Sequence, residues 1–224
     1  MRLRTAVAQL LCAVLLGALA LITAPVATAA PAQTPLRGGT LLYSPAGRCL
    51  VSFNATNGSR FYGIMAGQCG AVGTKWYADP RLTIEVGVTE TAVFPGKDYA
   101  LVRFTNPDYS YPSEVAAGVR VIRINRAANP VVGQSACRAG PTTGTHCGTV
   151  QAVNVSITYP QGTVSGLFRT NICAEPGDSG GPAFGGDAAL GFLVGGSGNC
   201  ASGGTTYYQP LAPVLSAHGL RVGY

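Results

Sequence analysis

The sequence has few charged residues, few histidines and almost no helical periodicity, and each shortage excludes a class of protein. Only 11% of its 224 residues are charged, and only 2 are histidines. Because it also lacks a Cys-x-x-Cys pair, the chain does not have the ligand pattern of a zinc site, and we predict no metal and no cofactor. The basic residues are scattered, which argues against a nucleic-acid surface despite the net charge of +6.

Long apolar runs are absent except near the N-terminus. Arg2 and Arg4 precede an apolar stretch over residues 6–22, and an Ala-x-Ala sequence follows at residues 27–29. This order is typical of a secretory signal peptide. The stretch is also long enough for a single membrane anchor, but the small residues after it favour cleavage. We therefore predict a signal peptide over residues 1–29 and a secreted mature chain that does not contact the membrane.

Short runs rich in β-branched and aromatic residues predict many short strands, separated by Gly, Pro, Asn and Asp. The runs are residues 40–43, 50–53, 82–88, 99–104, 119–124, 150–157, 164–169 and 189–194. This spacing indicates an all-β protein and favours two barrels. A break at residues 126–130 separates the strand-rich halves, so we predict domains over residues 30–128 and 129–224. A helix is predicted over residues 209–219, where a glycine ends it.

The strongest local signal is the sequence CAEPGDSGGP at residues 173–182. A serine between glycines on a sharp loop exposes its hydroxyl, and the surrounding N–H groups can converge as an oxyanion hole requires. A glycine-rich hairpin is the alternative reading, but the length of the motif favours a nucleophilic serine. Cysteine usage agrees with export, because Cys12 lies in the predicted signal peptide and leaves an even number, whose pairing the spacing does not select.

Several further motifs occur in a recognisable order. They are YSPAGRC at 43–49, KDYALVRFTN at 97–106, CRAGPTTGTHCGTV at 137–150, RTNICAEPGDSGGP at 169–182 and GGSGNCASGGTTYYQPL at 195–211. With them the chain resembles the chymotrypsin-fold bacterial endopeptidases of the streptogrisin and α-lytic protease group from about residue 38 onward. The resemblance implies two antiparallel six-stranded β-barrels with a short C-terminal helix, and an active site in the cleft between the barrels.

The resemblance also implies roles for individual residues. Ser179 matches the nucleophile, Asp98 matches the triad aspartate, and the N–H groups of Gly177 and Ser179 match the oxyanion hole. Asp178 matches the buried carboxylate that shapes this loop, with Arg138 as its partner. Further implied features are a strand that binds substrate at Val194, Gly195 and Gly196, and the disulfides Cys49–Cys69, Cys137–Cys147 and Cys173–Cys200.

The chain departs from this family at the catalytic histidine. The family has Thr-Ala-Gly-His-Cys, whereas this chain has MAGQC at residues 65–69, so Gln68 occupies the histidine position. A neutral carboxamide cannot take a proton from serine at neutral pH. We expect Gln68 to hydrogen-bond both Ser179 and Asp98, which would keep the shape of the triad without its function. Met65 is a further change, and Val194 replaces a serine that usually supports Asp98.

Other residues bear on activity and specificity. His146 and His218 could in principle replace the missing base, but neither follows a strand of the first barrel. No acidic residue marks a pocket for basic side chains, and Leu193 stands where glutamate-cleaving relatives have histidine, so we expect an apolar preference.

These observations together predict a catalytically impaired, monomeric pseudoprotease that binds peptide or protein segments in its cleft, with protease inhibitors among the candidate partners. The alternatives are an active but weak serine endopeptidase that cleaves after apolar residues, and a structural β protein with a closed cleft.

Overall fold

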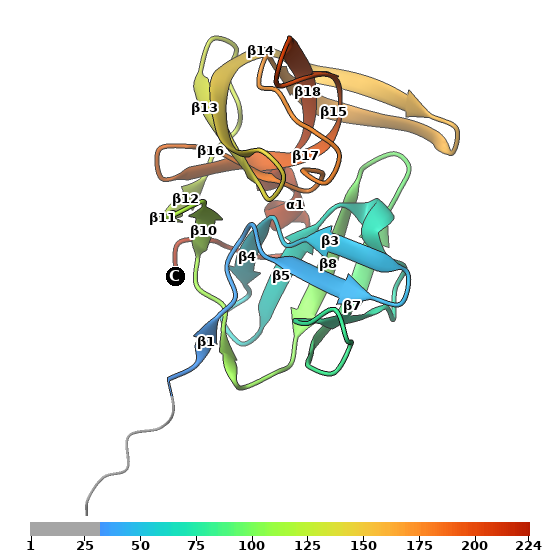
Figure 1. Cartoon of the computed structure of the whole chain (residues 1–224), viewed down its shortest axis with the longest axis vertical. Coiled ribbons are helices and arrows are strands. Elements are labelled where there is room, and N and C mark those ends of the chain that lie inside the picture. The colour runs from blue at the N-terminus through green and yellow to red at the C-terminus, as the bar shows by residue number, and fades with distance from the viewer. Residues whose placement is uncertain (1–31) are drawn as a thin grey trace, which may run out of the picture. The chain divides into compact units, whose positions relative to one another are not determined.

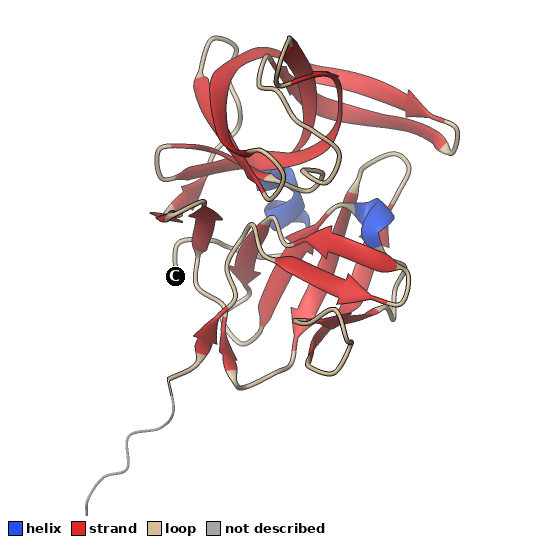
Figure 2. Ribbon diagram, viewed as in Figure 1, coloured by secondary structure: helices blue, strands red, loops and turns tan. Residues whose placement is uncertain are grey.

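The computed structural model describes residues 32–224, which form an almost entirely β-sheet fold (Figures 1 and 2). The predicted signal peptide at residues 1–29 lies outside the described residues. Within residues 32–224, no helix is long and apolar enough to cross a membrane. The helical elements are the short 3-10 helix η1 (Gly67–Cys69) and the α-helix α1 (Leu211–Ala217).

The first sheet contains strands from residues 41 to 104 in the order β3-β2-β6-β7-β8-β5-β4. These strands are β2 (Leu41–Ser44), β3 (Gly47–Leu50), β4 (Phe53–Thr56), β5 (Phe61–Met65), β6 (Lys75–Tyr77), β7 (Glu85–Val93) and β8 (Tyr99–Phe104). Only Val51 and Ser52 separate β3 from β4, and their N–H groups donate to the carbonyls of Thr40 and Ile64. Counted as one bent strand, β3 and β4 therefore close a barrel of six strands.

The second sheet has the order β12-β17-β16-β13-β14-β15-β18, and β17 also pairs with β18. Its strands are β12 (Arg126–Ala127), β13 (Ser135–Gly140), β14 (Gly144–Tyr159), β15 (Gly162–Thr170), β16 (Pro182–Gly185), β17 (Ala188–Asn199) and β18 (Gly203–Pro210). The β17–β18 pairing closes six of them into a ring, with β12 attached outside. The predicted fold class, two six-stranded barrels with a short C-terminal helix, is confirmed.

The remaining strands lie outside both barrels. β1 (Thr34–Pro35) pairs in parallel with β9 (Tyr109–Ser110), and β10 (Glu114–Ala117) forms an antiparallel hairpin with β11 (Arg120–Arg123). The predicted break at residues 126–130 includes β12, which pairs in parallel with β17 of the second sheet. The first two residues of the predicted break, Arg126 and Ala127, therefore belong to the second sheet.

Apolar side chains fill each barrel and also join the two barrels. Strand β8 is buried on both faces: Val102 and Phe104 point into the core of the first barrel, and Leu101 on the opposite face belongs to the cluster that joins the barrels. The first barrel encloses a core that includes Leu42, Met65, Trp76, Val86 and Val102. The core of the second includes Val150, Phe168, Leu190 and Tyr208. A larger cluster connects Phe53, Ile64 and Leu101 to Leu167, Phe192, Leu211 and Val214, so the barrels share buried apolar surface.

Hydrogen bonds also connect the barrels. The buried Ser52 hydroxyl donates to the carbonyl of Gly180 at 2.6 Å. The N–H of Gly96 donates to Thr163, while the carbonyl of Gly96 accepts from Ser165, so the β7–β8 loop adds to β15. The β14–β15 hairpin, gold in Figure 1, reaches the first barrel in this way.

The Ser52 contact should contribute measurably to stability. Ser52→Ala leaves the carbonyl of Gly180 without this donor in a buried place, so we expect a loss of about 1–3 kcal/mol. Urea unfolding of the purified domain would measure it. The control is Ser59→Ala, because Ser59 is exposed and its hydroxyl bonds only the nearby Asn57; its effect should stay within about 0.5 kcal/mol. Equal effects of the two substitutions would contradict the contribution assigned to Ser52.

Candidate active site

Two hollows meet at Ser179 in the cleft between the barrels. One, of about 220 Å³, is lined by Gln68, Asp98, Tyr159, Ser179 and Val194, among others. The other, of about 270 Å³, is lined by Ala174, Glu175, Pro176, Ser179, Leu193, Gly195, Gly196 and Gly198. The structure therefore brings together the serine, the aspartate and the glutamine that the sequence placed in one site.

Asp98 is fully buried and accepts its hydrogen bonds from two consecutive residues. Its Oδ1 accepts from the N–H of Gly67 at 2.6 Å and of Gln68 at 3.3 Å. Its Oδ2 accepts from the Gln68 side-chain Nε2 at 3.0 Å. The Gln68 side chain thus lies beside the aspartate, and its amide N–H group faces the carboxylate.

The predicted second hydrogen bond of Gln68 is absent. Within residues 32–224, the Ser179 hydroxyl forms no hydrogen bond, either to Gln68 or to another side chain. The expectation that Gln68 bonds Ser179 and Asp98 together is therefore wrong in this structure. The physical reason is that the Gln68 side chain is exposed and flexible, and its hydrogen bond to Asp98 fixes only the Nε2 atom. The rigid ring of a histidine would instead present one nitrogen to Asp98 and the other to Ser179.

Burial raises the pKa of Asp98 above its usual value, and the hydrogen bonds from Gln68 and Gly67 only partly offset this effect. Val194 is itself buried and its side chain offers no donor to the carboxylate. All three hydrogen bonds to the Asp98 carboxylate therefore come from residues 67 and 68. This matches the loss of support that the sequence indicated at position 194.

In the serine loop, residues 173–181, the N–H groups of the two residues that flank Asp178 are unpaired within the described part of the chain. Gly177 has φ +100°, a value that favours glycine, and the N–H groups of Gly177 and Ser179 have no hydrogen-bond acceptor within residues 32–224. The neighbouring Gly180 donates to the carbonyl of Leu193 at 2.7 Å, and Gly181 donates to that of Asp178 at 2.9 Å. An oxyanion hole requires free donors of this kind on a fixed loop.

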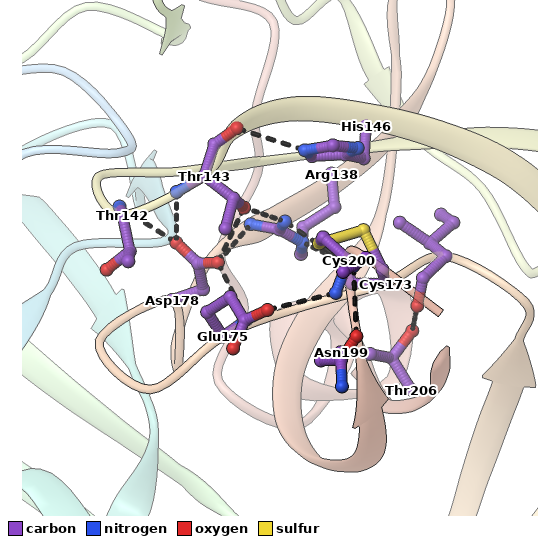
Figure 3. The surroundings of a disulfide bond; sticks show 12 residues. Arg138, Thr142, Thr143, His146, Cys173, Glu175, Asp178, Asn199, Cys200 and Thr206 are labelled. Atoms are coloured by element: carbon purple, nitrogen blue, oxygen red, sulfur yellow. Dashed lines mark hydrogen bonds and ion pairs between the residues drawn. A yellow bond between two sulfur atoms is a disulfide. The ribbon is translucent and has the colours of Figure 1, made fainter. Parts of the chain in front are cut away.

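Asp178 holds this loop through a buried network, shown in Figure 3. Its Oδ1 accepts from the N–H of Thr142 at 3.0 Å, and its Oδ2 accepts from the Thr143 hydroxyl at 2.7 Å and the N–H of Glu175 at 3.1 Å. The Nη1 of Arg138, which is also fully buried, lies 3.4 Å from Oδ2. The structure therefore joins Asp178 and Arg138 as the resemblance implied.

The Asp178 environment favours the ionised carboxylate. Burial by itself would raise the pKa, but the hydrogen bonds from Thr143 and Glu175 and the Arg138 guanidinium outweigh it, so the pKa of Asp178 lies below its usual value. A Cβ at Gly140 would overlap both Arg138 and Asp178, which explains why that position is glycine. The sequence singled out Asp178 and Arg138 but missed Thr143, whose hydroxyl bonds both of them.

The strand expected to bind substrate has an open edge beside Ser179. β16 pairs with β17 only as far as Phe192, and from Val194 onward β17 pairs only with β18. Gly195 and Gly196 lie on this stretch and line the hollow next to Ser179. An extended segment can therefore reach main-chain groups of β17 here.

Tyr159 is a cleft residue that the sequence did not single out. It is at the end of β14, and its hydroxyl donates to the carbonyl of Val194 at 2.8 Å. Its ring packs edge-on against Phe94 of the first barrel. The only sequence feature that could have drawn attention to Tyr159 is the turn that follows it, Pro160 to Gly162, which marks the tip of a hairpin.

Neither histidine reaches the cleft. The His146 Nε2 lies 3.0 Å from the carbonyl of Thr143, and the His218 Nε2 lies 3.1 Å from the Tyr99 hydroxyl. Neither residue lines the hollows at Ser179.

The potential metal ligands that gather within residues 32–224 are His146, Cys173 and Cys200. Their two sulfurs form a disulfide, so no thiolate is free to bind a metal. The other implied disulfides, Cys49–Cys69 and Cys137–Cys147, are also present, which confirms the predicted pairing.

The double barrel, with the serine loop and the buried aspartate in one cleft, defines the chymotrypsin class of serine endopeptidase folds. The sequence matches the Trypsin family over residues 51–217, and the chain belongs to this family.

Curated relatives and solved structures identify the group within the family. Streptogrisin-C of Streptomyces griseus is 46% identical over 191 residues, which cover 84% of this chain and 41% of that protein. Streptogrisin-D of the same organism is 42% identical over 193 residues, which cover 85% and 49%. The chain thus spans less than half the length of these two relatives.

Among solved structures, the alpha-lytic protease homolog N4 has 54% sequence identity and a TM-score of 0.78, over 84% of this chain and 99% of that one. The Cellulomonas bogoriensis chymotrypsin has 42% identity and a TM-score of 0.74, over 84% and 98%. The resemblance to streptogrisins and α-lytic protease is confirmed.

The Asp178 network predicts a pH-dependent contribution to stability. Because its native pKa is lowered, the ionised carboxylate stabilises the fold above the ordinary Asp range near ~3.9, and this contribution is lost as the pH falls through the native pKa. Asp178→Asn leaves Arg138 buried without its counter-charge and should cost about 3–5 kcal/mol at neutral pH. Urea unfolding across pH should show the difference from wild type narrowing in acid. The exposed Asp108→Asn is the control, and a difference independent of pH would contradict the assignment.

Proposed function

We propose that this chain is an exported pseudoprotease of the trypsin family, which binds extended peptide or protein segments beside Ser179 without cutting them. The observation that carries the proposal is Gln68, whose side-chain amide takes the histidine position next to Asp98. Ser179 would be the former nucleophile, and the N–H groups of Gly177 and Ser179 would form the oxyanion hole.

The expected loss of catalysis is large. A carboxamide has no basicity near neutral pH, so no group beside Ser179 takes its proton during attack. Losing the histidine of a comparable triad lowers turnover on the order of 10⁶-fold, or about 8 kcal/mol of barrier. The oxyanion hole and binding alone leave about 10³–10⁴ over water. Both histidines are engaged outside the cleft, so neither of them replaces the missing base.

Peptide binding does not require the histidine. The open edge of β17 offers main-chain groups beyond Val194, whose own carbonyl accepts from the Tyr159 hydroxyl, and the 270 Å³ hollow beside Ser179 can accept a side chain. Leu193 and Ala174 line this hollow and would contact an apolar side chain. Contrary to the expectation that no acidic residue marks the pocket, Glu175 lines it as well, and its carboxylate accepts from the N–H of Cys200. The two hollows also argue against the alternative of a closed, purely structural cleft. Protease inhibitors, which present such extended segments, fit this description as partners of a monomeric protein.

The second candidate is a weak serine endopeptidase that cleaves after apolar residues. The observation in its favour is the serine loop, because two N–H groups remain free where an oxyanion hole requires them. An oxyanion hole at these N–H groups would support slow turnover if a functional group of the substrate acted as the base. The two candidates differ in whether the Ser179 hydroxyl reacts at all.

The pseudoprotease and the weak endopeptidase can be distinguished by a turnover assay. The substrates are chromogenic peptides with an apolar residue before the scissile bond. We expect wild type to be as silent as Ser179→Ala, because Gln68 accepts no proton. Gln68→His should gain activity, and Gln68→His with Val194→Ser should gain more, since the new hydroxyl can support Asp98. Cleavage by wild type that Ser179→Ala abolishes would overturn the pseudoprotease and support the weak endopeptidase.

Binding is the second measurement. An uncut peptide with an apolar side chain for the hollow should bind wild type and Ser179→Ala with similar affinity and remain intact by mass spectrometry. Ala174→Phe, which fills the hollow, should weaken binding about tenfold or more, or about 1.4 kcal/mol. The control is Ala71→Phe, at an exposed position of the first barrel. If Ala174→Phe binds as wild type does, the peptide does not use this hollow.

A further inference from the structure

A larger hollow lies beside the β10–β11 hairpin. Its volume is about 680 Å³, and it shares no lining residue with the two hollows at Ser179. Much of its wall is apolar, from Ala117, Val121, Ile122, Phe184 and the Cys137–Cys147 disulfide. In Figure 1, β10 and β11 lie to the left, below β16. We call this hollow the β11 groove.

One wall of the β11 groove is an open strand edge. β11 pairs only with β10, in a register where Ala117 faces Arg120 across the turn. In an antiparallel hairpin the residues alternate, so the main-chain groups of Arg120 and Ile122 face β10 while those of Val121 and Arg123 face away. Within residues 32–224, the N–H and C=O groups of Val121 and Arg123 have no hydrogen-bond partner. They are spaced as a pairing strand requires.

The opposite edge of the hairpin is occupied, which supports this assignment. The carbonyl of Glu114 accepts from the N–H of Gly38, and the N–H of Ala116 donates to the carbonyl of Gly38. Residues 38, 114–117 and 120–123 thus form a small sheet that is complete on one side and open on the other. Val121 is 52% exposed at the open side, which is unusual for a valine beside an apolar hollow.

The rim of the β11 groove is positively charged. Arg120 and Arg123 are exposed, and neither has a carboxylate within ion-pair distance in the described part of the chain. The one acidic residue that lines the groove, Asp187, accepts from Asn125 at 3.0 Å and lies 3.7 Å from Arg126. Two arginines therefore remain available for carboxylates of a partner.

We propose that the β11 groove binds an extended acidic segment of another protein, which adds as a strand to the edge of β11. Main-chain groups of Val121 and Arg123 pair with the segment, and apolar side chains at alternate positions enter the groove. Arg120 and Arg123 are three residues apart on β11, so their side chains point to opposite faces, and the carboxylates of the segment meet the arginine on their own face. Residues 1–31 of this chain contain no acidic residue, so they lack the charge that the rim requires. This site is separate from the cleft and does not depend on the state of Gln68.

The test uses a fluorescent synthetic peptide that alternates valine with glutamate, compared with one that alternates valine with lysine. Titration of the full secreted chain, followed by fluorescence anisotropy, should show that the glutamate peptide binds at least about tenfold more tightly. Arg120→Glu with Arg123→Glu should remove this preference, whereas Arg81→Glu, an exposed arginine of the first barrel, should not. Val121→Pro should weaken binding of the glutamate peptide without disturbing the β10–β11 pairing, because the N–H that it removes faces away from β10 and the side chain that it replaces lines the groove.

Hydrogen exchange supplies a second measurement. The amides of Val121 and Arg123 should become protected when the glutamate peptide binds. Equal affinity for the two peptides, or unchanged affinity in the double arginine variant, would overturn the proposal. So would sedimentation showing that this edge is covered by a second copy of the chain, because the occupant would then be the protein itself.

Discussion

The active-site loop depends on one buried carboxylate. Residues 171–181 contain almost no regular structure, so the ladder hydrogen bonds that fix the barrels are not available to hold them. Asp178 replaces those bonds by accepting from Thr142, Thr143 and Glu175 next to the Arg138 guanidinium. The free N–H groups of Gly177 and Ser179 follow from that arrangement. A loop fixed in this way keeps its shape whether or not a base stands beside the serine.

The histidine position is filled in a way that suits the buried aspartate. Asp98 is in a place where burial opposes its charge, and a residue at position 68 must supply a donor. The Gln68 amide does so, and the backbone N–H groups of Gly67 and Gln68 supply the rest. An aliphatic residue there would remove one of the three donors. The Gln68 amide thus supports the buried Asp98 carboxylate, and under the proposed function it does so without providing a base for Ser179.

Most of the fold could be predicted because several motifs occur in family order, and fixed cysteines set the disulfides. The pattern alone missed β5, β13, β16 and β18, since glycines and small residues within them interrupt the apolar alternation, and it missed β6, which is only 3 residues long. In the site, Ser179, Asp98 and Gln68 follow from short motifs, but Tyr159 and Thr143 do not, because their contacts depend on hairpins that fold back across the chain. The free Ser179 hydroxyl also depended on a side-chain conformation that no sequence pattern records.

The contact between Gly96 and the β14–β15 hairpin has a consequence for the cleft as a receptor. This bridge, together with Ser52 at Gly180 and the shared apolar cluster, holds the two walls in place before any ligand arrives. A preorganised cleft loses little conformational entropy on binding, so affinity comes from contacts without an ordering cost. If bound segments are never hydrolysed, occupancy follows simple mass action, and binding stabilises the folded protein by an amount that grows with the logarithm of the ratio of segment concentration to Kd. The rigid cleft that positions a substrate in an active protease would then favour slow dissociation of an intact ligand.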